Sequence, residues 1–173
     1  GQRGGGSGGG GGADAAPELQ LLATLQGHRG AVMSLACDAK HMYSGSVDRS
    51  VRVWDVVGLR QLRALFLPEM HAPVYGVAIA RGTHAEGAQL LSASHDVRVW
   101  QHGALGAHAL EHKGPVLAVA AAPAVCYSGG GDGTLRAWEL PDLKPLRTFE
   151  SKEGGHPVKA VVVMAGHKEL RKE

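Results

Sequence analysis

YSGSVDRSVRVWD (Tyr43 to Asp55) is the stretch of sequence that decides the fold, because it returns twice along the chain. The second copy is LSASHDVRVWQ (Leu91 to Gln101) and the third is YSGGGDGTLRAWE (Tyr127 to Glu139). Each copy follows a histidine and an apolar, alternating stretch, and these stretches are GHRGAVMSLAC, MHAPVYGVAIA and EHKGPVLAVAA. A fourth start, GHPVKAVVVM, begins at Gly155. A unit that recurs in this way indicates a repeat protein, in which each unit is one structural module.

The repeat interval is close to 40 residues. The leading histidines are spaced by 43, 41 and 44 residues, and they are His28, His71, His112 and His156. The tryptophans are spaced by 46 and 38 residues, and they are Trp54, Trp100 and Trp138. A period of this length, with several short strands in each unit, is typical of solenoid or propeller arrays.

Within each unit the side chains alternate with a period of two. The clearest case is the end of the first copy, where Ser50, Arg52 and Trp54 alternate with Val51, Val53 and Asp55. Short runs of this kind, bounded by Gly, Asp, Ser and Pro, predict antiparallel strands joined by turns. Helical heptads are absent from the sequence. We therefore predict an all-β chain.

A Gly-His start, then Ser-x-x-x-Asp, then a Val-Arg-Val-Trp-Asp end resembles the WD repeat of β-propellers. The resemblance implies blades of four antiparallel strands, with complete blades at about 30–66, 73–110 and 115–150. It also implies an orphan outer strand at Leu21 to Leu25 and a lone inner strand at Val158 to Val163. Closed propellers have about 4 to 8 blades, so we expect a partial propeller that needs further blades from the parent chain or a partner.

The chain divides into three parts by composition. Residues 1–18 are rich in glycine and are expected to form a flexible linker, since glycine loses the most backbone entropy on ordering. Residues 19–163 hold the repeats, with a partial fourth blade from residue 156. Residues 164–173 are expected to be a charged, solvated tail.

The resemblance also implies a structural hydrogen-bond network in each blade, joining a His, a Ser, an Asp and a Trp. The expected sets are His28, Ser44, Asp48 and Trp54; His71, Ser92, Asp96 and Trp100; and His112, Ser128, Asp132 and Trp138. The second repeat departs from the pattern, because Asp96 precedes Trp100 by four residues where the other two spacings are six. Its set is therefore expected to be incomplete, with a distorted turn.

Composition excludes several classes of function. The chain has 173 residues with a formal net charge of +2, which gives no electrostatic argument for nucleic acid or an anionic membrane. No run approaches the roughly 18 apolar residues of a membrane span. Cys37 and Cys126 both sit in apolar stretches and are expected to be buried free thiols. We expect no membrane, no cofactor and a cytoplasmic location, with the nucleus or cilium as alternatives.

Catalytic and metal sites are not expected. Ser94, His95 and Asp96 are adjacent, and adjacent strand residues point to opposite faces, so they cannot form a relay. The histidines lack a cysteine or carboxylate at zinc-ligand spacing. The glycines of GGGDG, at 129–133, fit a tight turn that needs positive φ rather than a phosphate loop. One arginine stands two residues before each Trp (Arg52, Arg98 and Arg136), and we expect these to be solvated or salt-bridged.

The expected function is that of a non-catalytic scaffold that docks a protein or peptide. By resemblance, partners bind the rim where the first strands begin, and the expected contact residues are Met33, Tyr75, His95, Leu117 and Lys159. Adaptable Met and amphipathic Tyr suit such a surface. The alternative is that Met33, Tyr75 and Leu117 are core-adjacent strand residues. Two further alternatives for the whole protein are the substrate-recognition domain of a ubiquitin-ligase-type protein and a structural subunit of a large ciliary or ribosomal assembly.

Overall fold

The computed structural model describes residues 19–66, 71–81, 88–101, 104–150 and 155–163. Over these residues the chain forms twelve β-strands and no helix. The strands make three four-stranded antiparallel sheets, each built from four consecutive strands. The prediction of an all-β chain with three four-stranded blades is confirmed. The expected linker at 1–18 and the expected charged tail at 164–173 lie outside the described residues.

We call the sheets blades 1, 2 and 3 in chain order. Blade 1 comprises β1 (Val32–Cys37), β2 (His41–Ser46), β3 (Val51–Asp55) and β4 (Arg60–Leu65). Blade 2 comprises β5 (Gly76–Ala80), β6 (Gln89–Ala93), β7 (Val97–Gln101) and β8 (Ala104–Ala109). Blade 3 comprises β9 (Val116–Ala121), β10 (Val125–Gly130), β11 (Thr134–Glu139) and β12 (Lys144–Glu150).

A β-bulge recurs beside the tryptophan of every blade. The register between the third and fourth strands shifts at Val53/Trp54, Val99/Trp100 and Ala137/Trp138. A bulge bends the strand and changes the direction in which a side chain points. Because it falls at the same place each time, the three tryptophans take equivalent positions in their blades.

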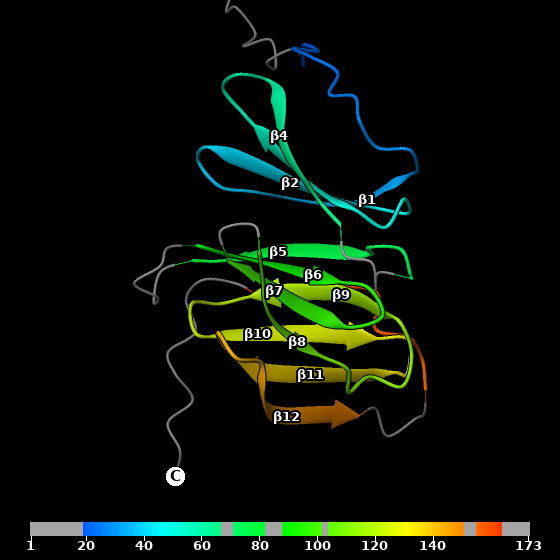
Figure 1. Cartoon of the computed structure of the whole chain (residues 1–173). Coiled ribbons are helices and arrows are strands. Elements are labelled where there is room, and N and C mark those ends of the chain that lie inside the picture. Colours follow the sequence, from blue (N-terminus) through cyan, green and yellow to red (C-terminus); the bar gives the residue numbers. More distant parts are fainter. Residues whose placement is uncertain (1–18, 67–70, 82–87, 102–103, 151–154, 164–173) are drawn as a thin grey trace, which may run out of the picture.

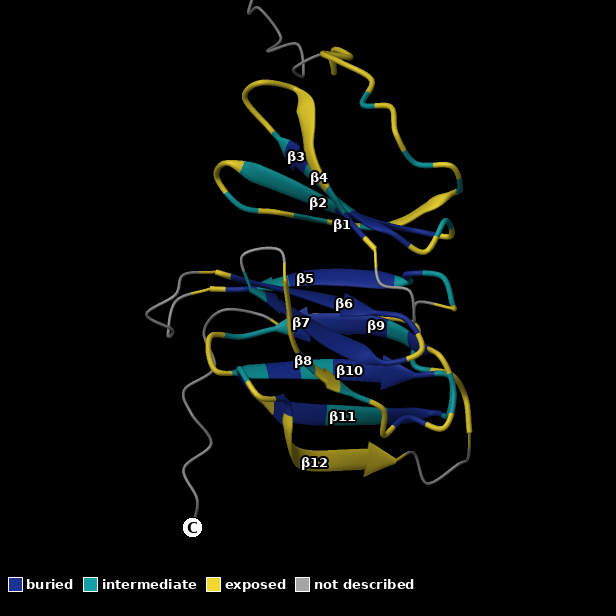
Figure 2. Cartoon of the chain, in the orientation of Figure 1, coloured by how far each residue is buried: buried dark blue, intermediate teal, exposed yellow. Residues whose placement is uncertain are grey.

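The blades are stacked face to face, with their inner strands adjacent (Figure 1). β1 contacts β5, and β5 contacts β9. Two apolar clusters lie between the sheets. The first, between blades 1 and 2, contains Val51, Leu65, Val74, Val77, Leu90 and Trp100. The second, between blades 2 and 3, includes Leu91, Val97, Val99, Val116, Val119 and Trp138. In Figure 2 the buried residues concentrate in blades 2 and 3, as expected where sheets pack on one another.

A backbone hydrogen bond joins each blade to the next at the valine that leads into the inner strand. The N–H of Val74 donates to Ser46 O (3.0 Å), and that of Val116 donates to Ser94 O (2.8 Å). The N–H of Val158 donates to Gly130 O (3.0 Å) in the same way. Residues 155–163 therefore lie against blade 3 at the place where a fourth blade would begin.

The two terminal strands expected from the sequence are absent. Leu21 to Leu25 and Val158 to Val163 have no strand assignment in the structure. A strand requires a ladder partner, and neither segment is paired as a strand with any described part of the chain.

Blade 1 has one uncovered face. Leu35 of β1 is 60% exposed, whereas its equivalents Val77 and Val119 are 5% and 8% exposed. The leading valine, Val32, is 50% exposed, although Val74 and Val116 are fully buried. Cys37, expected to be buried, is exposed at the end of the same strand, while Cys126 is buried as predicted. Blade 1 differs because no preceding sheet packs on it in the described structure.

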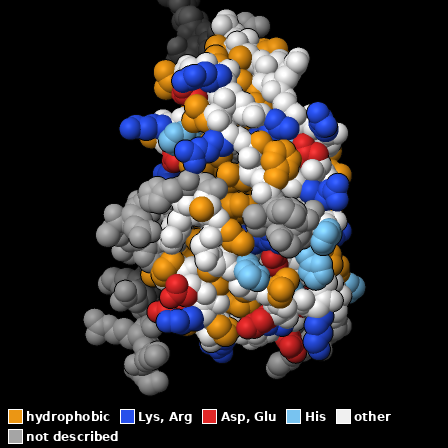
Figure 3. Space-filling model, viewed as in Figure 1, with side chains coloured by type: hydrophobic (Ala, Val, Ile, Leu, Met, Phe, Trp, Pro, Cys, Tyr) orange, Lys and Arg blue, Asp and Glu red, His pale blue; other side chains and the backbone are white. Residues whose placement is uncertain are grey.

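Figure 3 shows how charge is distributed over one side of this stack. Lys and Arg side chains gather over the upper part of the view, which blade 1 occupies, and acidic side chains are more frequent lower down.

Candidate functional site

In blade 1 the structure brings all four predicted network residues together. His28 Nδ1 lies 2.8 Å from Asp48 Oδ2, and His28 Nε2 lies 2.7 Å from Ser44 Oγ. Trp54 Nε1 donates to Ser44 Oγ at 2.8 Å. Ser50 also joins the network, because its Oγ contacts both the Asp48 carboxylate and His28 Nδ1. The network connects the segment before β1 to β2, to β3 and to the turn between them.

Blade 3 repeats this arrangement. His112 Nδ1 lies 3.1 Å from Asp132 Oδ1, His112 Nε2 lies 2.8 Å from Ser128 Oγ, and Trp138 Nε1 donates to Ser128 Oγ at 2.8 Å. Thr134 takes the place that Ser50 has in blade 1, with its Oγ1 donating to Asp132 at 2.8 Å. Sequence reasoning missed both hydroxyl residues. The signal was present, since each hydroxyl residue stands two positions after the Asp.

The direction of the hydrogen bonds follows from what each group can do. A carboxylate only accepts, so His112 Nδ1 carries the hydrogen that faces Asp132. In a neutral imidazole the other nitrogen is then an acceptor, so the Ser128 hydroxyl donates to His112 Nε2. Ser128, His112 and Asp132 are therefore hydrogen-bonded in the same order as the Ser, His and Asp of a hydrolytic triad, but the serine is not accessible. Ser128 is 0% exposed and its oxygen accepts from Trp138, so no substrate reaches this hydroxyl.

The turn aspartates remain ionised because of the donors around them. Burial alone would raise the pKa of Asp132, but the N–H groups of Lys113 and Thr134 and the His112 ring hold that pKa well below its usual range. Asp48 behaves alike, with Ser50, the Arg29 N–H and His28 outweighing burial and lowering its pKa.

The network predicts an acid-sensitive fold. Burial lowers the pKa of His112, and the carboxylate of Asp132 only partly opposes this shift. Asp48, Asp132 and His112 all have lowered pKa values in the folded chain, so each binds protons more readily when the chain is unfolded. The stabilisation that they contribute is therefore present near pH 7 and is lost on acidification. The loss begins below about pH 6.5 with His112 and becomes steep below about pH 4, where unfolded aspartates take up protons. Urea unfolding measured at a series of pH values should show this fall.

Asp132→Asn is the control for that experiment. This substitution should lower the free energy of unfolding at pH 7. It should also make that free energy depend less on pH between about pH 5 and 3, since one titrating group is removed. A stability that rises on acidification from pH 7 to 5, or an unchanged slope in Asp132→Asn, would contradict the proposed role of the network.

Blade 2 lacks the predicted network, and the expectation for His71 is wrong. His71 is exposed and makes no hydrogen bond to Ser92 or Asp96. Trp100 Nε1 still donates to Ser92 Oγ at 2.8 Å. Asp96 instead forms a buried ion pair with Arg98, whose Nε lies 2.8 and 2.7 Å from the two carboxylate oxygens.

The shorter turn of blade 2 explains this exchange of partners. In blades 1 and 3 the hydroxyl residue stands two positions after the Asp, and the arginine stands two positions before the Trp. With two residues fewer between Asp96 and Trp100, both positions fall on Arg98. The guanidinium of Arg98 therefore occupies the place that the hydroxyl has in the other blades, and it pairs with the Asp96 carboxylate. The other two arginines bond outward, Arg136 to Glu111 at 2.9 Å and Arg52 to Gln61.

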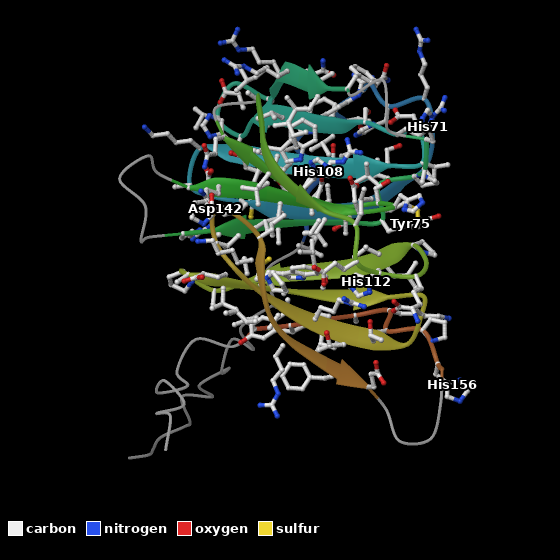
Figure 4. All side chains as sticks on the ribbon, turned by 60° about the horizontal axis from the view of Figure 1, so that its bottom comes forward. His71, Tyr75, His108, His112, Asp142 and His156 are labelled. Atoms are coloured by element: carbon white, nitrogen blue, oxygen red, sulfur yellow. The ribbon has the colours of Figure 1, made fainter. Side chains whose placement is uncertain are left out.

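The predicted partner-binding residues lie where the inner strands begin, an end of the blades that we call the leading rim. Met33 lies in β1 and Leu117 in β9, while Tyr75 immediately precedes β5. Met33 and Lys159 are exposed, and Tyr75 and Leu117 are half-buried. In Figure 4, Tyr75, His71 and His156 lie toward one end of the strands, and Asp142 lies at the opposite end.

The turns between second and third strands reach the same rim. The N–H of Val47 donates to Ala31 O (2.9 Å), and the N–H of Gly131 donates to Pro115 O (2.7 Å). These bonds place the turns beside the residues that lead into β1 and β9. In blade 2, His95 lies exposed in the corresponding turn. As predicted for a tight turn, Gly133 has a positive φ of 78°.

Over residues 19–163, apart from the short undescribed gaps, no group of three or more His, Cys, Asp or Glu side chains is arranged to hold a metal ion. None of these described residues forms a helix long and apolar enough to span a bilayer.

Comparisons with known proteins agree with this geometry. Residues 19–55 match the family "WD domain, G-beta repeat". An F-box/WD-40 repeat-containing protein of Arabidopsis thaliana is 29% identical over 121 residues, covering 67% of this chain and 21% of that protein.

Two solved structures have a similar fold. The structure of U3-55K is 29% identical with a TM-score of 0.65, and it covers 75% of this chain and 40% of its own. The WD40 β-propeller domain of Doa1 is 25% identical with a TM-score of 0.66, and it covers 78% of this chain and 44% of its own. The chain thus spans less than half of each of these relatives.

Three features now converge. The repeats carry the His, Ser, Asp and Trp pattern, the sheets are stacked four-stranded blades, and the similar domain of Doa1 is a WD40 β-propeller. The chain therefore has the fold of a partial WD-repeat β-propeller, and its residues 19–55 match the WD-repeat family.

Proposed function

We propose that this propeller segment is a non-catalytic scaffold that binds a protein or peptide on its leading rim. WD-repeat propellers are in general protein-interaction domains, and the leading rim carries the residues that favour this role here. The observation that supports the proposal is a row of accessible side chains, one from each repeat, at the position after the leading valine: Met33, Tyr75, Leu117 and Lys159.

The row has the properties of a contact surface. None of the four residues belongs to either apolar cluster between the blades. Tyr75 and Leu117 combine partial burial with accessibility, so they are held in place while presenting apolar surface. Aromatic and Met side chains are enriched at interface centres, and charged side chains at rims. Lys159 and His95 would accordingly flank an apolar centre.

Replacing both Tyr75 and Leu117 with Ala should abolish partner capture. Central anchors of an interface commonly contribute about 2 kcal/mol each, so the affinity should fall by at least about 30-fold. The measurement compares the proteins that copurify with the wild-type chain and with the double variant. Circular dichroism should be unchanged, because neither side chain belongs to the apolar clusters between the blades.

Leu146→Ala is the matched control, since Leu146 is an exposed apolar residue on the outer strand β12. It should retain every protein that the wild type captures. Loss of structure in the double variant would show that Tyr75 and Leu117 are core residues. An unchanged set of captured proteins would contradict binding at the leading rim.

We further propose that another blade of the same type covers the open face of blade 1. The existing junctions define what such a blade would supply. At the junction of blades 1 and 2 a glycine, Gly45, faces the leading valine, and a Cβ built there would lie 2.6 Å from Val74 Cγ1. A Cβ built at Gly129 would likewise lie 2.6 Å from Val158 Cγ1. The covering blade should therefore present a small residue to Val32, followed by a carbonyl that accepts its N–H.

One observation favours a second candidate function, the substrate-recognition domain of a ubiquitin-ligase-type protein. The relative from Arabidopsis thaliana combines WD-40 repeats with an F-box. The full-length polypeptide decides between the two candidates. An F-box or RING module in the same polypeptide as residues 19–163 would favour this candidate, and a complete polypeptide without such a module would contradict it.

A further inference from the structure

A second surface lies at the opposite end of the strands, where the inner strands end. A groove of about 870 Å³ opens there between blades 1 and 2. The turn between β1 and β2 forms one side of it, β4 forms another, and the residue that follows β5, Arg81, stands across from the turn. The groove is separate from the leading rim, because its lining residues Asp38 and Arg81 directly follow the last residues of β1 and β5, whereas the rim lies where these strands begin.

The floor of the groove is apolar. Leu65, Leu90 and Trp100, which are members of the cluster between blades 1 and 2, form its base. Leu62 of β4 stands at its mouth and is 41% exposed. An apolar side chain that entered would remove its own surface and that of Leu62 from water, which is favourable by about 25 cal/mol per Å².

The Asp38 carboxylate at the edge of the groove accepts hydrogen bonds from residues close to it in the chain. Asp38 Oδ1 accepts from the N–H groups of Lys40 (2.7 Å) and His41 (2.8 Å), and Tyr43 donates its hydroxyl to Oδ2 (3.3 Å). Burial and the neighbouring carboxylate raise the pKa of Tyr43 to about 12, so this phenol stays a neutral donor. Both oxygens of the Asp38 carboxylate thus accept hydrogen bonds from residues close to it in the chain.

Two of the cations that line the groove are Lys40 and Arg81. Within the described residues neither Lys40 nor Arg81 forms an ion pair. Arg81 is held across the groove by one bond, from Nη2 to Cys37 O at 2.6 Å. This leaves its other guanidinium donors free to meet an anion. Figure 3 shows the wider setting, with Lys and Arg side chains gathered over blade 1.

We infer that this groove binds an acidic peptide segment of a partner protein, with an apolar side chain on the floor and carboxylates beside Lys40 and Arg81. An apolar floor between unpaired cations matches a ligand that alternates apolar and acidic groups. A nucleic acid is a poorer match, because two cations contact few phosphates.

The probe is a fluorescent peptide with leucine and phenylalanine at its centre and aspartates on both sides. Fluorescence anisotropy with the full chain should give a dissociation constant of about 10–100 µM at low salt. Two further peptides control the chemistry: one replaces the aspartates with lysines, and the other replaces the apolar pair with serines. Neither should bind measurably.

Lys40→Glu and Leu62→Ser should each weaken binding by about fivefold or more, because one reverses a charge and the other removes apolar surface. Both side chains are exposed, so circular dichroism should not change. Lys113→Glu is the matched control, with the same change of charge at the leading rim. It should bind the acidic peptide as the wild type does.

Three results would each overturn the inference. The first is absence of binding up to about 1 mM peptide. The second is an equal loss in Lys113→Glu, which would show attraction by net charge rather than by the groove. The third is equal binding of the serine peptide, which would show that the apolar floor has no part. None of these outcomes bears on the leading rim, whose test uses other residues.

Discussion

Replacing Arg98 with Met should lower the free energy of unfolding by about 3–5 kcal/mol. The Asp96 carboxylate is 2% exposed and its hydrogen-bonding partner is Arg98, so the substitution leaves a buried charge without compensation. Met keeps most of the apolar length of the side chain, which limits the loss of packing. Urea unfolding at pH 7 measures the change.

Two matched variants isolate the ion pair. Arg136→Met changes the corresponding residue of blade 3, where the side chain of the partner Glu111 is 47% exposed, and should lower the free energy of unfolding by under about 1 kcal/mol. The double variant Asp96→Leu with Arg98→Met removes both charges and should recover most of the stability, because a buried pair is often replaceable by apolar residues. A loss of less than about 1 kcal/mol in Arg98→Met would contradict the uncompensated charge.

The three blades could be predicted from sequence because their signals are local and recur. The spacing of the tryptophans and the alternation before each of them indicated a repeated all-β unit, and the resemblance to WD repeats implied a four-stranded blade for each repeat. The four-residue networks of blades 1 and 3 followed from the resemblance. Choosing Ser44 over Ser46 was possible because Ser recurs four positions before the Asp in every repeat, and Trp54 does donate to Ser44.

Blade 2 could not be predicted in full because a shortened turn changes which side chains meet. The missing two residues were visible, and they correctly suggested an incomplete network. That Arg98 would become buried and take the carboxylate from His71 depended on where the shortened turn placed the guanidinium. Arginine is rarely buried unless paired, so an exposed position was the natural expectation.

The ends of the repeat array also depended on packing that sequence patterns do not report. Leu21 to Leu25 and Val158 to Val163 have strand-like composition, but a strand forms only when a neighbour supplies its ladder. The exposure of Leu35 and Cys37 has the same origin. Their sequence context is that of a buried strand, and the sheet that would bury them is not among the described residues.

A pair of equivalent substitutions tests most directly whether the blades repeat one another and whether blade 1 has an open face. Leu35 and Val119 occupy the same position of their inner strands, yet they are 60% and 8% exposed. Val119→Asp should lower the free energy of unfolding by about 3 kcal/mol or more, since it buries an unpaired carboxylate. Leu35→Asp should change it by no more than about 0.5 kcal/mol, because water still reaches that carboxylate.

The measurement is urea unfolding of both variants beside the wild type at pH 7, with residues 1–173 alone and no added protein that could supply the covering blade. A large loss for Val119→Asp with almost none for Leu35→Asp is the predicted result. Equal losses would show that the face of blade 1 is covered, and two small losses would show that the blades are not stacked as described.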